Sequence, residues 1–332
     1  MMRGVAKLAA GPGHVGYVER PDAVAGPGQV VVELRAAGVC GTDLHIEAGE
    51  YPAVPPVTMG HELCGVVAEL GEGVDEAWLG ERVTAETFYS TCGVCRFCRA
   101  GRPSICPLRQ SIGTHVDGAF APRVRLPVRN LHRVPDAVGD HAAAICEPVA
   151  CCCNSLSDPG AIEVGDEVLV IGPGAIGLIA AQVARAAGGR VHVRGAPHDG
   201  ARLALARSLG FEISTADEAW AGDAPDVVVE CSGAESGIAA ALETVGRGGT
   251  IVQMGLRGER VTVPYDEICF KELRVRAGFA SNPTSWRRAM RLIDEGAVEL
   301  APLITGVVEL GDFQQALSRS RAADGVKFLL VP

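Results

Sequence analysis

The sequence lacks any long hydrophobic run. None of its 332 residues lies in an apolar stretch of the roughly 18 residues that a membrane-spanning helix requires. The opening residues, MMRGVAKLAAGPG, are too short and too interrupted by glycine to form the core of a signal peptide. These absences predict a cytoplasmic protein without a membrane partner.

A basic excess is missing as well. The chain has 30 Lys and Arg residues against 40 Asp and Glu residues, which gives a net charge of −10. Proteins that bind nucleic acids usually carry a basic surface, so the charge argues against a nucleic-acid partner. The sequence also has no internal repeats and no low-complexity segment. Its length is typical of two domains.

Cysteine, by contrast, is abundant, with twelve residues. Four of them form a C-x2-C-x2-C-x7-C pattern in the segment TCGVCRFCRAGRPSIC: Cys92, Cys95, Cys98 and Cys106. A structural zinc ion takes four ligands in a tetrahedron and favours thiolates, and Gly93 and Gly101 allow the tight turns of such a loop. Four thiolates leave no coordination position on the zinc for water or substrate, so this loop is predicted to have a structural role rather than a catalytic one. Free or oxidised cysteines are the alternative, which a reducing compartment disfavours.

A second, mixed set of polar side chains, several of which can bind a metal, lies on either side of this loop. Its members are Cys40, Thr42 and His45 in VCGTDLHIEAG, His61 and Glu62 in MGHELCG, and Glu147 in ICEPVACC. One thiol, one imidazole and carboxylates are typical of a catalytic zinc, which has about three protein ligands and an exchangeable position. Each residue alone has a structural explanation. The combination with the four-cysteine loop favours a second zinc site.

In order and spacing, C-G-T-D-x-H, G-H-E and the four-cysteine pattern resemble the zinc-dependent medium-chain alcohol dehydrogenases. The E-P-x-A of residues 147–150 resembles their polyol (sorbitol-type) and threonine dehydrogenase branch. The resemblance implies a GroES-like, β-rich catalytic domain in residues 1–155, completed by about 281–332, and a Rossmann nucleotide-binding domain in residues 156–280. It also implies roles for the mixed set. Cys40 and His61 would bind the catalytic zinc, with Glu62 or Glu147 as the exchangeable third ligand or a partner of the ligands, and Thr42 and His45 would relay the alcohol proton through the cofactor ribose to solvent.

The segment EVLVIGPGAIGLIAAQVARAAGG predicts a buried strand, a glycine-rich turn and a helix. Its G-x-G-x-x-G stands in the strand-to-helix context that binds a dinucleotide, with the pyrophosphate at the helix N terminus. The residues of this turn are Gly172, Gly174, Ala175, Ile176 and Gly177. Further apolar strand candidates at 191–193, 226–230, 250–255 and 273–279 favour an α/β fold with a doubly wound parallel sheet.

The end of the second strand, VHVRGAPHDGARL, predicts the cofactor. An acid about 20 residues after the glycines would bind the ribose of NAD, whereas an Arg nearby accommodates the 2′-phosphate of NADP. Gly195 stands where that acid is expected, beside Arg194 and near His198, so NADP is favoured. The alternative is that Asp199 turns in to hold NAD. The loops ECSGA, QMGL and AGFASNPTSW resemble the family's nicotinamide-lining loops, with Cys231, Ser232, Gly255 and Phe279 as cofactor contacts.

These patterns together predict an enzyme with two zinc ions per chain, one catalytic and one structural. It would transfer a hydride between a nicotinamide cofactor and a secondary alcohol or its ketone: a polyol, a sugar or cyclitol derivative, or an amino alcohol. A threonine-type amino-alcohol dehydrogenase is the alternative, and a non-catalytic NAD(P) sensor of the same fold is a remote one. A homodimer or homotetramer is expected. The loop TFYSTC (87–92) is expected near the substrate. His115 is expected at the surface, and the alternative is a hydrogen-bond donor to the substrate.

Overall fold

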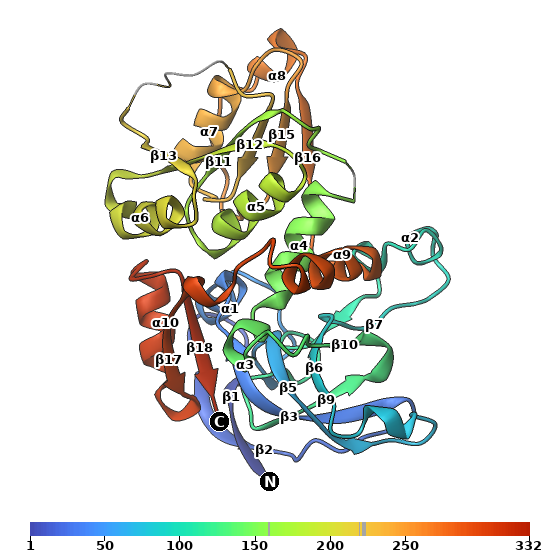
Figure 1. Cartoon of the computed structure of the whole chain (residues 1–332). Helices are drawn as coiled ribbons and strands as arrows, with labels where there is room; N and C mark the ends of the chain where they lie inside the picture. Colours follow the sequence, from blue (N-terminus) through green and yellow to red (C-terminus); the bar gives the residue numbers. More distant parts are fainter. Residues whose placement is uncertain (159, 219, 221–223) are drawn as a thin grey trace. The chain divides into compact units, whose positions relative to one another are not determined.

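The computed structural model describes residues 1–158, 160–218, 220 and 224–332 (Figure 1). They form two compact units. Unit 1 consists of Met1–Glu147, Ser281–Trp286 and Leu300–Pro332, and unit 2 of Pro148–Ala280 and Arg287–Glu299. Within the described ranges, no helix is long and apolar enough to cross a membrane.

Unit 1 is built around the long strand β3 (Gln29–Gly38). Along one edge β3 pairs with β5 (Glu62–Leu70); along the other it pairs with β9 (Arg123–Pro127) and, near its C-terminal end, with β18 (Lys327–Val331). The same sheet contains β6 (Arg82–Ala85), β10 (Leu131–Arg133) and β17 (Ile304–Glu309). Because Gly38 faces Glu62 on one side and Leu329 on the other, the sheet brings the first residues of β5 and β18 to the same place.

Smaller elements complete unit 1. A three-stranded sheet is formed by β1 (Met2–Lys7), β2 (Val15–Arg20) and β4 (Val57–Thr58), and a two-stranded one by β7 (Phe88–Ser90) and β8 (Gln110–Ser111). The helices are α1 (Gly41–Ala48), α2 (Arg96–Arg99), α3 (Asp140–Ala143) and α10 (Phe313–Arg321). Two further helices, α4 (Cys146–Leu156) and α9 (Pro283–Asp294), have residues in both units.

Unit 2 contains a parallel sheet with the strand order β13-β12-β11-β14-β15-β16. Its strands are β11 (Glu167–Ile171), β12 (Arg190–Gly195), β13 (Glu212–Thr215), β14 (Val227–Glu230), β15 (Thr250–Gln253) and β16 (Arg274–Ala277). The connecting helices, visible beside the sheet in Figure 1, are α5 (Ala175–Ala186), α6 (Gly200–Ser208), α7 (Glu235–Thr244) and α8 (Glu267–Phe270). Numbered from β11, this is the order 3-2-1-4-5-6 of a doubly wound nucleotide-binding sheet.

The predicted α/β class, with a parallel doubly wound sheet, is confirmed. Apolar runs such as EVLVI and VVVE are buried almost throughout, as expected for strands covered on both faces. The sequence did not predict β13. Three of its four residues, EIST, are polar and none is fully buried, so they give neither an apolar run nor an alternating pattern.

Candidate metal and cofactor sites

The first candidate site begins where β3 ends and α1 starts. Cys40 is the N-cap residue of α1, and its backbone N–H donates to Asp43 Oδ2 at 2.9 Å. Asp43 is fully buried, so the turn that presents the Cys40 thiol is fixed from inside the protein. Thr42 Oγ1 lies 3.7 Å from Cys40 Sγ, within hydrogen-bond range for sulfur.

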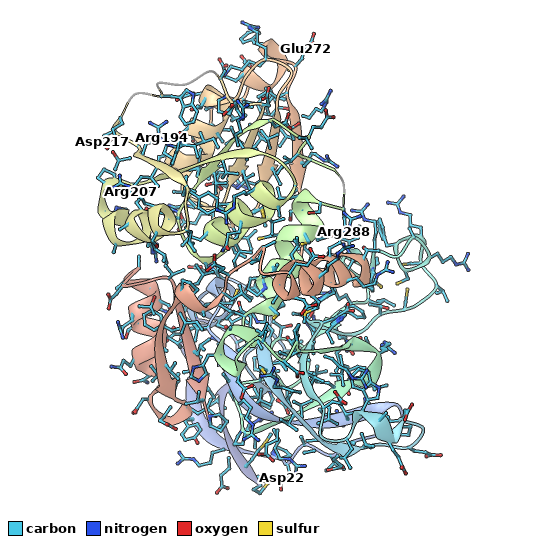
Figure 2. The ribbon with its side chains drawn as sticks, viewed as in Figure 1. Asp22, Arg194, Arg207, Asp217, Glu272 and Arg288 are labelled. Atoms are coloured by element: carbon cyan, nitrogen blue, oxygen red, sulfur yellow. The ribbon has the colours of Figure 1, made fainter. Side chains whose placement is uncertain are left out.

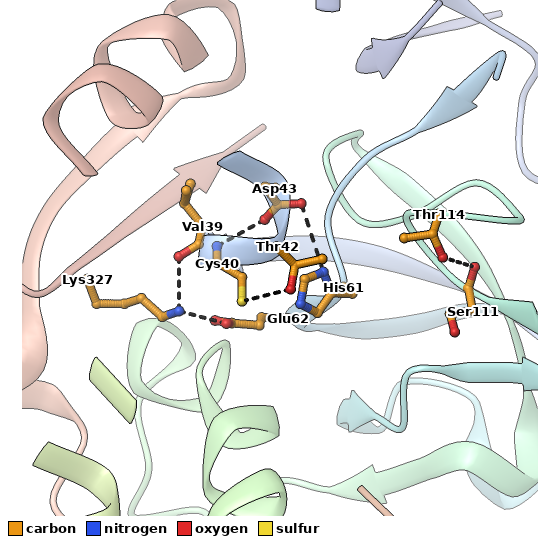
Figure 3. A network of polar contacts seen from close by, with 9 residues as sticks. All are labelled: Val39, Cys40, Thr42, Asp43, His61, Glu62, Ser111, Thr114 and Lys327. Carbon is orange, nitrogen blue, oxygen red and sulfur yellow. Dashed lines mark hydrogen bonds and ion pairs between the residues drawn. The ribbon is translucent and has the colours of Figure 1, made fainter. Parts of the chain in front are cut away.

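Cys40, His61 and Glu62 come together in space. One ligand atom of each lies within 4.8 Å of those of the other two. His61 directly precedes β5 and Glu62 is its first residue, so β5 and the start of α1 supply the three groups (Figure 3). The predicted thiolate, imidazole and carboxylate therefore form one compact set in unit 1.

Negative charge dominates around His61. Burial alone lowers the pKa of His61, but the Cys40 thiolate, Asp43 and Glu147 outweigh it and raise the pKa to about 10. Asp43 Oδ1 lies 3.9 Å from His61 Nδ1. A pocket that favours a positive charge this strongly suits a divalent cation, whose ligand imidazole commonly has a carboxylate behind it.

Lys327, at the start of β18, is a neighbour that the sequence did not predict. Its Nζ donates to Glu62 Oε1 at 2.6 Å and to the Val39 carbonyl at 2.9 Å, and the two charged side chains are 4% and 0% exposed. Burial lowers the pKa of Lys327, whereas Glu62 and Cys40 raise it, and the net shift is upward. Lys327 therefore stays charged and holds one oxygen of Glu62.

The second oxygen of Glu62 tests whether a metal fits. Glu62 Oε2 is buried and has no hydrogen-bond partner among the described residues. An unpaired buried carboxylate oxygen is costly, and here it accompanies a thiol and an imidazole. The donor set therefore fits a zinc ion, which binds sulfur, nitrogen and carboxylate oxygen.

The other predicted members of the set lie nearby. Glu147, in the first turn of α4, is 5% exposed and falls outside the group of three ligand atoms, but its charge raises the pKa of His61 and of Lys327. His45 lies on α1 with its Nδ1 2.7 Å from Glu50 Oε2.

The four cysteines of residues 92–106 also converge, and all are free thiols. The sulfur–sulfur distances are 3.5 Å for Cys95–Cys98, 3.6 Å for Cys106–Cys92 and 4.0 Å for Cys92–Cys98. A disulfide would require about 2.05 Å, whereas zinc–sulfur bonds of about 2.3 Å give a tetrahedron with edges of about 3.8 Å. The observed spacing therefore fits a closed zinc site with four thiolate ligands.

Backbone groups favour thiolates in this loop. The N–H groups of Cys92, Cys95 and Cys98 point at the sulfurs of Cys106, Cys92 and Cys95 at 3.3–3.4 Å. Hydrogen bonds from the backbone of Val94 and Cys95 lower the pKa of Cys92 to about 6, whereas burial raises the pKa of Cys98 to about 11. Gly93 and Gly101 both have φ of 70°, the left-handed conformation predicted for the tight turns.

In unit 2, the glycine-rich turn connects β11 to α5. Gly172 has φ of 97°, and a Cβ there would lie 2.8 Å from Ser232 N. A Cβ on Gly177 would lie 1.8 Å from Gly172 O, so the turn cannot close on a larger residue. A Cβ on Gly174, the N-cap of α5, would meet nothing within 4 Å. The turn is thus tight on the inside and open at the helix N terminus, where a pyrophosphate binds in such folds. The predicted Ala175 and Ile176 form the first turn of α5.

The predicted nicotinamide-lining loops follow β14 and β15, and Glu230, which the sequence did not single out, ties them together. Its buried carboxylate accepts the N–H groups of Ser232 at 2.8 Å and Gly233 at 3.1 Å, the Ser232 hydroxyl, and Gln253 Nε2 at 2.7 Å. Its carbonyl accepts the N–H of Gly255 at 2.9 Å. The loops that carry Cys231, Ser232 and Gly255 therefore share one anchor. The predicted Phe279 lies after β16 and is 44% exposed.

At the end of β12, the Arg194 side chain already forms hydrogen bonds within unit 2. Arg194 donates to the carbonyls of Thr215, Ala216 and Glu218, and it lies next to Asp217 at this edge of unit 2 (Figure 2). A Cβ on Gly195 would come 3.0 Å from Pro173 Cγ and 3.1 Å from Asp199 Cβ, so a side chain there would have to displace its neighbours by a few tenths of an ångström.

The alternative ligand for NAD, Asp199, is 8% exposed. Its Oδ2 accepts the N–H of Ala196 at 2.9 Å, and its Oδ1 pairs with Arg202 Nη1 at 3.3 Å. The predicted His198 lies beside it on an exposed 3₁₀ turn, Pro197–Asp199. Asp199 therefore stabilises its own turn rather than pointing outward.

Known proteins with the same features are numerous. Residues 26–136 match the family described as the alcohol dehydrogenase GroES-like domain, and residues 175–295 match the zinc-binding dehydrogenase family. The sorbitol dehydrogenase of Halalkalibacterium halodurans is 36% identical, over all of this chain and 99% of that protein. The D-arabitol-phosphate dehydrogenase of Enterococcus avium is 30% identical, over 99% and 97%. A protein of Sinorhizobium meliloti described as a zinc-binding dehydrogenase and crystallised with NADP has the same fold, with a TM-score of 0.89, 35% identity and coverage of 100% and 99%.

Matches of this extent, together with the two sites, establish the class of the protein. The chain belongs to the zinc-dependent medium-chain alcohol dehydrogenases, in their polyol and threonine dehydrogenase branch, and is an oxidoreductase that depends on zinc and a nicotinamide cofactor.

Proposed function

We propose that the chain oxidises a secondary alcohol of a polyol, sugar derivative or amino alcohol, reversibly, at the site formed by Cys40, His61 and Glu62. The observation that carries the proposal is the convergence of these three groups. One of them, Glu62, has a buried carboxylate oxygen without a hydrogen-bond partner among the described residues. The names of the two relatives, sorbitol and D-arabitol-phosphate dehydrogenase, support a polyol-like substrate. A zinc ion held there would polarise the alcohol oxygen as a Lewis acid.

The chain's own residues then handle the proton. The position of Thr42, with Oγ1 3.7 Å from the Cys40 sulfur, supports a role as the first proton acceptor: its hydroxyl would accept the hydroxyl proton of a substrate at this site and release its own proton. His45 passes a proton to solvent, and Glu50, 2.7 Å from its Nδ1, orients the ring. An imidazole suits this exchange because one ring nitrogen can accept a proton while the other donates one.

The test combines metal analysis with a substrate panel. The purified enzyme should contain two zinc ions per chain, and a chelator should remove one quickly, with loss of activity, while the ion of the four-cysteine loop remains. Glu62→Gln and Glu147→Gln, compared for zinc affinity, identify the carboxylate that binds directly. Polyols, sugar derivatives and amino alcohols are then screened by nicotinamide absorbance. An enzyme that holds its zinc and cofactor but oxidises none of them would refute the proposed activity.

We also propose that the cofactor is NADP. The tight surroundings of Gly195 and the internal contacts of Asp199 both count against an acid that holds the ribose of NAD. Arg194 and His198 flank the place where a 2′-phosphate would bind. Arg194→Ala should raise the KM for NADP about 10- to 100-fold, the value of one charge-assisted hydrogen bond, and change the KM for NAD little.

The matched control for Arg194 is Arg190→Ala. Arg190 lies on the same strand, pairs with Glu167 at 3.2 Å, and its side chain is 76% exposed. Arg190→Ala should leave the KM for NADP and the KM for NAD within about twofold of the wild-type values, as a surface substitution does. An equal rise in the KM for NADP and NAD in Arg194→Ala would instead mean that Arg194 only holds the loop after β13.

We propose that the native protein is a homodimer or homotetramer that uses the free edge of β16. This strand ends the sheet of unit 2, and Tyr265, Phe270 and Val275 around it are 67%, 68% and 52% exposed. Unpaired edges with apolar side chains favour strand pairing with another chain. Light scattering should give a mass two or four times 34.5 kDa, and Val275→Lys should lower it; a wild-type mass of one chain would refute the assembly.

A further inference from the structure

A group of polar side chains in unit 1, outside the metal-binding set, surrounds the turn after β8. Arg109 Nη2 donates to Thr87 Oγ1 at 3.0 Å, and Ile112 N donates to the carbonyl of the same Thr87. Thr87 is 4% exposed and Arg109 is itself partly buried. The guanidinium is therefore drawn toward the interior of unit 1 rather than extended into solvent.

His115 belongs to this group, although a surface position was predicted for it. Its ring is partly buried, and its Nδ1 accepts the N–H of Ser111 at 3.4 Å and lies 2.9 Å from Thr114 Oγ1. In the neutral ring one of the two nitrogens carries a hydrogen and can donate it. Burial, and then the charge of Arg109, lower the pKa of His115, so the ring is a neutral donor.

Tyr51 connects the group to the metal-binding set. Its N–H donates to the carbonyl of His45 on α1 at 3.2 Å, and three residues later Val54 N donates to the carbonyl of Thr114 at 2.8 Å. The segment 51–54 thus runs from the helix that begins at Cys40 to the turn that carries His115. Burial raises the pKa of Tyr51, Arg109 lowers it and Cys40 raises it. The phenol is within electrostatic reach of both the ligand thiol and the guanidinium.

We propose that Arg109, Tyr51 and His115 form a subsite for a carboxylate or phosphate on the alcohol substrate. The inference rests on the function proposed above. A guanidinium offers a planar fork of donors that matches either anion, and the Tyr51 hydroxyl and the neutral His115 ring each add one donor. A neutral polyol offers these three side chains hydrogen-bond acceptors but no negative charge, whereas a carboxylate or phosphate offers both. The substrate class is therefore a sugar acid or a sugar phosphate.

The test uses matched pairs of alcohols on the zinc- and cofactor-loaded enzyme: D-gluconate against D-glucitol, and D-arabitol 5-phosphate against D-arabitol. The anionic member of at least one pair should have a kcat/KM about 10- to 100-fold higher, the effect of one charge-assisted hydrogen bond, and the pair that shows it identifies carboxylate or phosphate. Arg109→Ala should remove this preference, mainly through KM, and leave the neutral partner within about threefold. Arg109→Lys should restore part of it.

Arg125→Ala, an exposed arginine on β9, is the control and should keep the preference. If the wild type prefers both neutral alcohols, or if Arg109→Ala lowers both members of a pair equally, the subsite is refuted while the dehydrogenase activity stands. If no alcohol is oxidised, the proposed activity fails, and calorimetry still decides the subsite. Binding of D-gluconate or the phosphate that Arg109→Ala abolishes supports it, and the absence of such binding overturns it.

Discussion

Replacing Cys40 with alanine is expected to lower kcat by about a thousandfold or more. The variant loses the only thiolate of the mixed ligand set, and with it the charge that contributes most to the raised pKa of His61. Loss of the Lewis acid removes several kcal/mol of transition-state stabilisation, and each 1.36 kcal/mol is a factor of ten. The cofactor dissociation constant, measured by nicotinamide fluorescence, should change less than about twofold, because the proposed cofactor residues are in unit 2.

Cys64→Ala is the matched control for this experiment. Cys64 is another cysteine of unit 1. It is buried on β5, three positions after His61, and is not part of either metal-binding group. It should keep two zinc ions per chain and near-normal turnover, whereas Cys40→Ala should keep one. Normal turnover in Cys40→Ala would mean that the catalytic centre lies elsewhere.

Replacing Lys327 with methionine should destabilise the protein by about 3–5 kcal/mol, the usual cost of leaving one member of a buried ion pair alone. Lys327 is 4% exposed and Glu62 is 0% exposed, so water cannot replace the lost partner. The Val39 carbonyl also loses its donor. The change would appear as a lower urea midpoint for unit 1, followed by the fluorescence of its Trp78 and Trp286.

The double variant Lys327→Met, Glu62→Gln distinguishes the contribution of the ion pair to stability from the contribution of side-chain packing. With the carboxylate neutral, the cost of an uncompensated buried charge disappears, so the double variant should be more stable than Lys327→Met alone. If the double variant has a lower midpoint than either single variant, by the sum of their effects, the two side chains do not interact energetically. Zinc content, measured on all four proteins, separates a loss of metal from a loss of folding stability.

The sequence was informative where a residue type and its spacing specify a chemistry. Four thiols at short intervals have few uses in a reducing compartment, and their sulfurs do lie at distances that suit zinc. A glycine-rich turn between a buried strand and a helix was equally specific, since Gly172 and Gly177 have no room for a side chain. Such patterns are local, and local geometry follows from local sequence.

The residues that the sequence missed depend on contacts between distant segments. A lysine that opens an apolar run, as in KFLLV, resembles a solvated strand end, and only the pairing of β18 with β3 places it beside Glu62, 265 positions away. The same is true of Arg109, and of the position of His115, which was expected at the surface. Their spacing is uninformative, and the hydrogen bonds from Val54 and to Thr87 are what bring them toward α1. Glu230 ends a hydrophobic strand, where an acid is normally exposed, but the turn wraps around it.

The anchoring of two loops by Glu230 limits how this enzyme can be re-engineered. A Cβ on Gly255 would lie 2.6 Å from the Glu230 carboxylate, a Cβ on Gly237 would lie 3.0 Å from it, and Gly233 has φ of 64°. Substitutions in either loop are therefore coupled to the other through a single side chain. Libraries intended to change cofactor preference should vary the edge formed by β12 and β13 and leave these three glycines and their shared acid untouched.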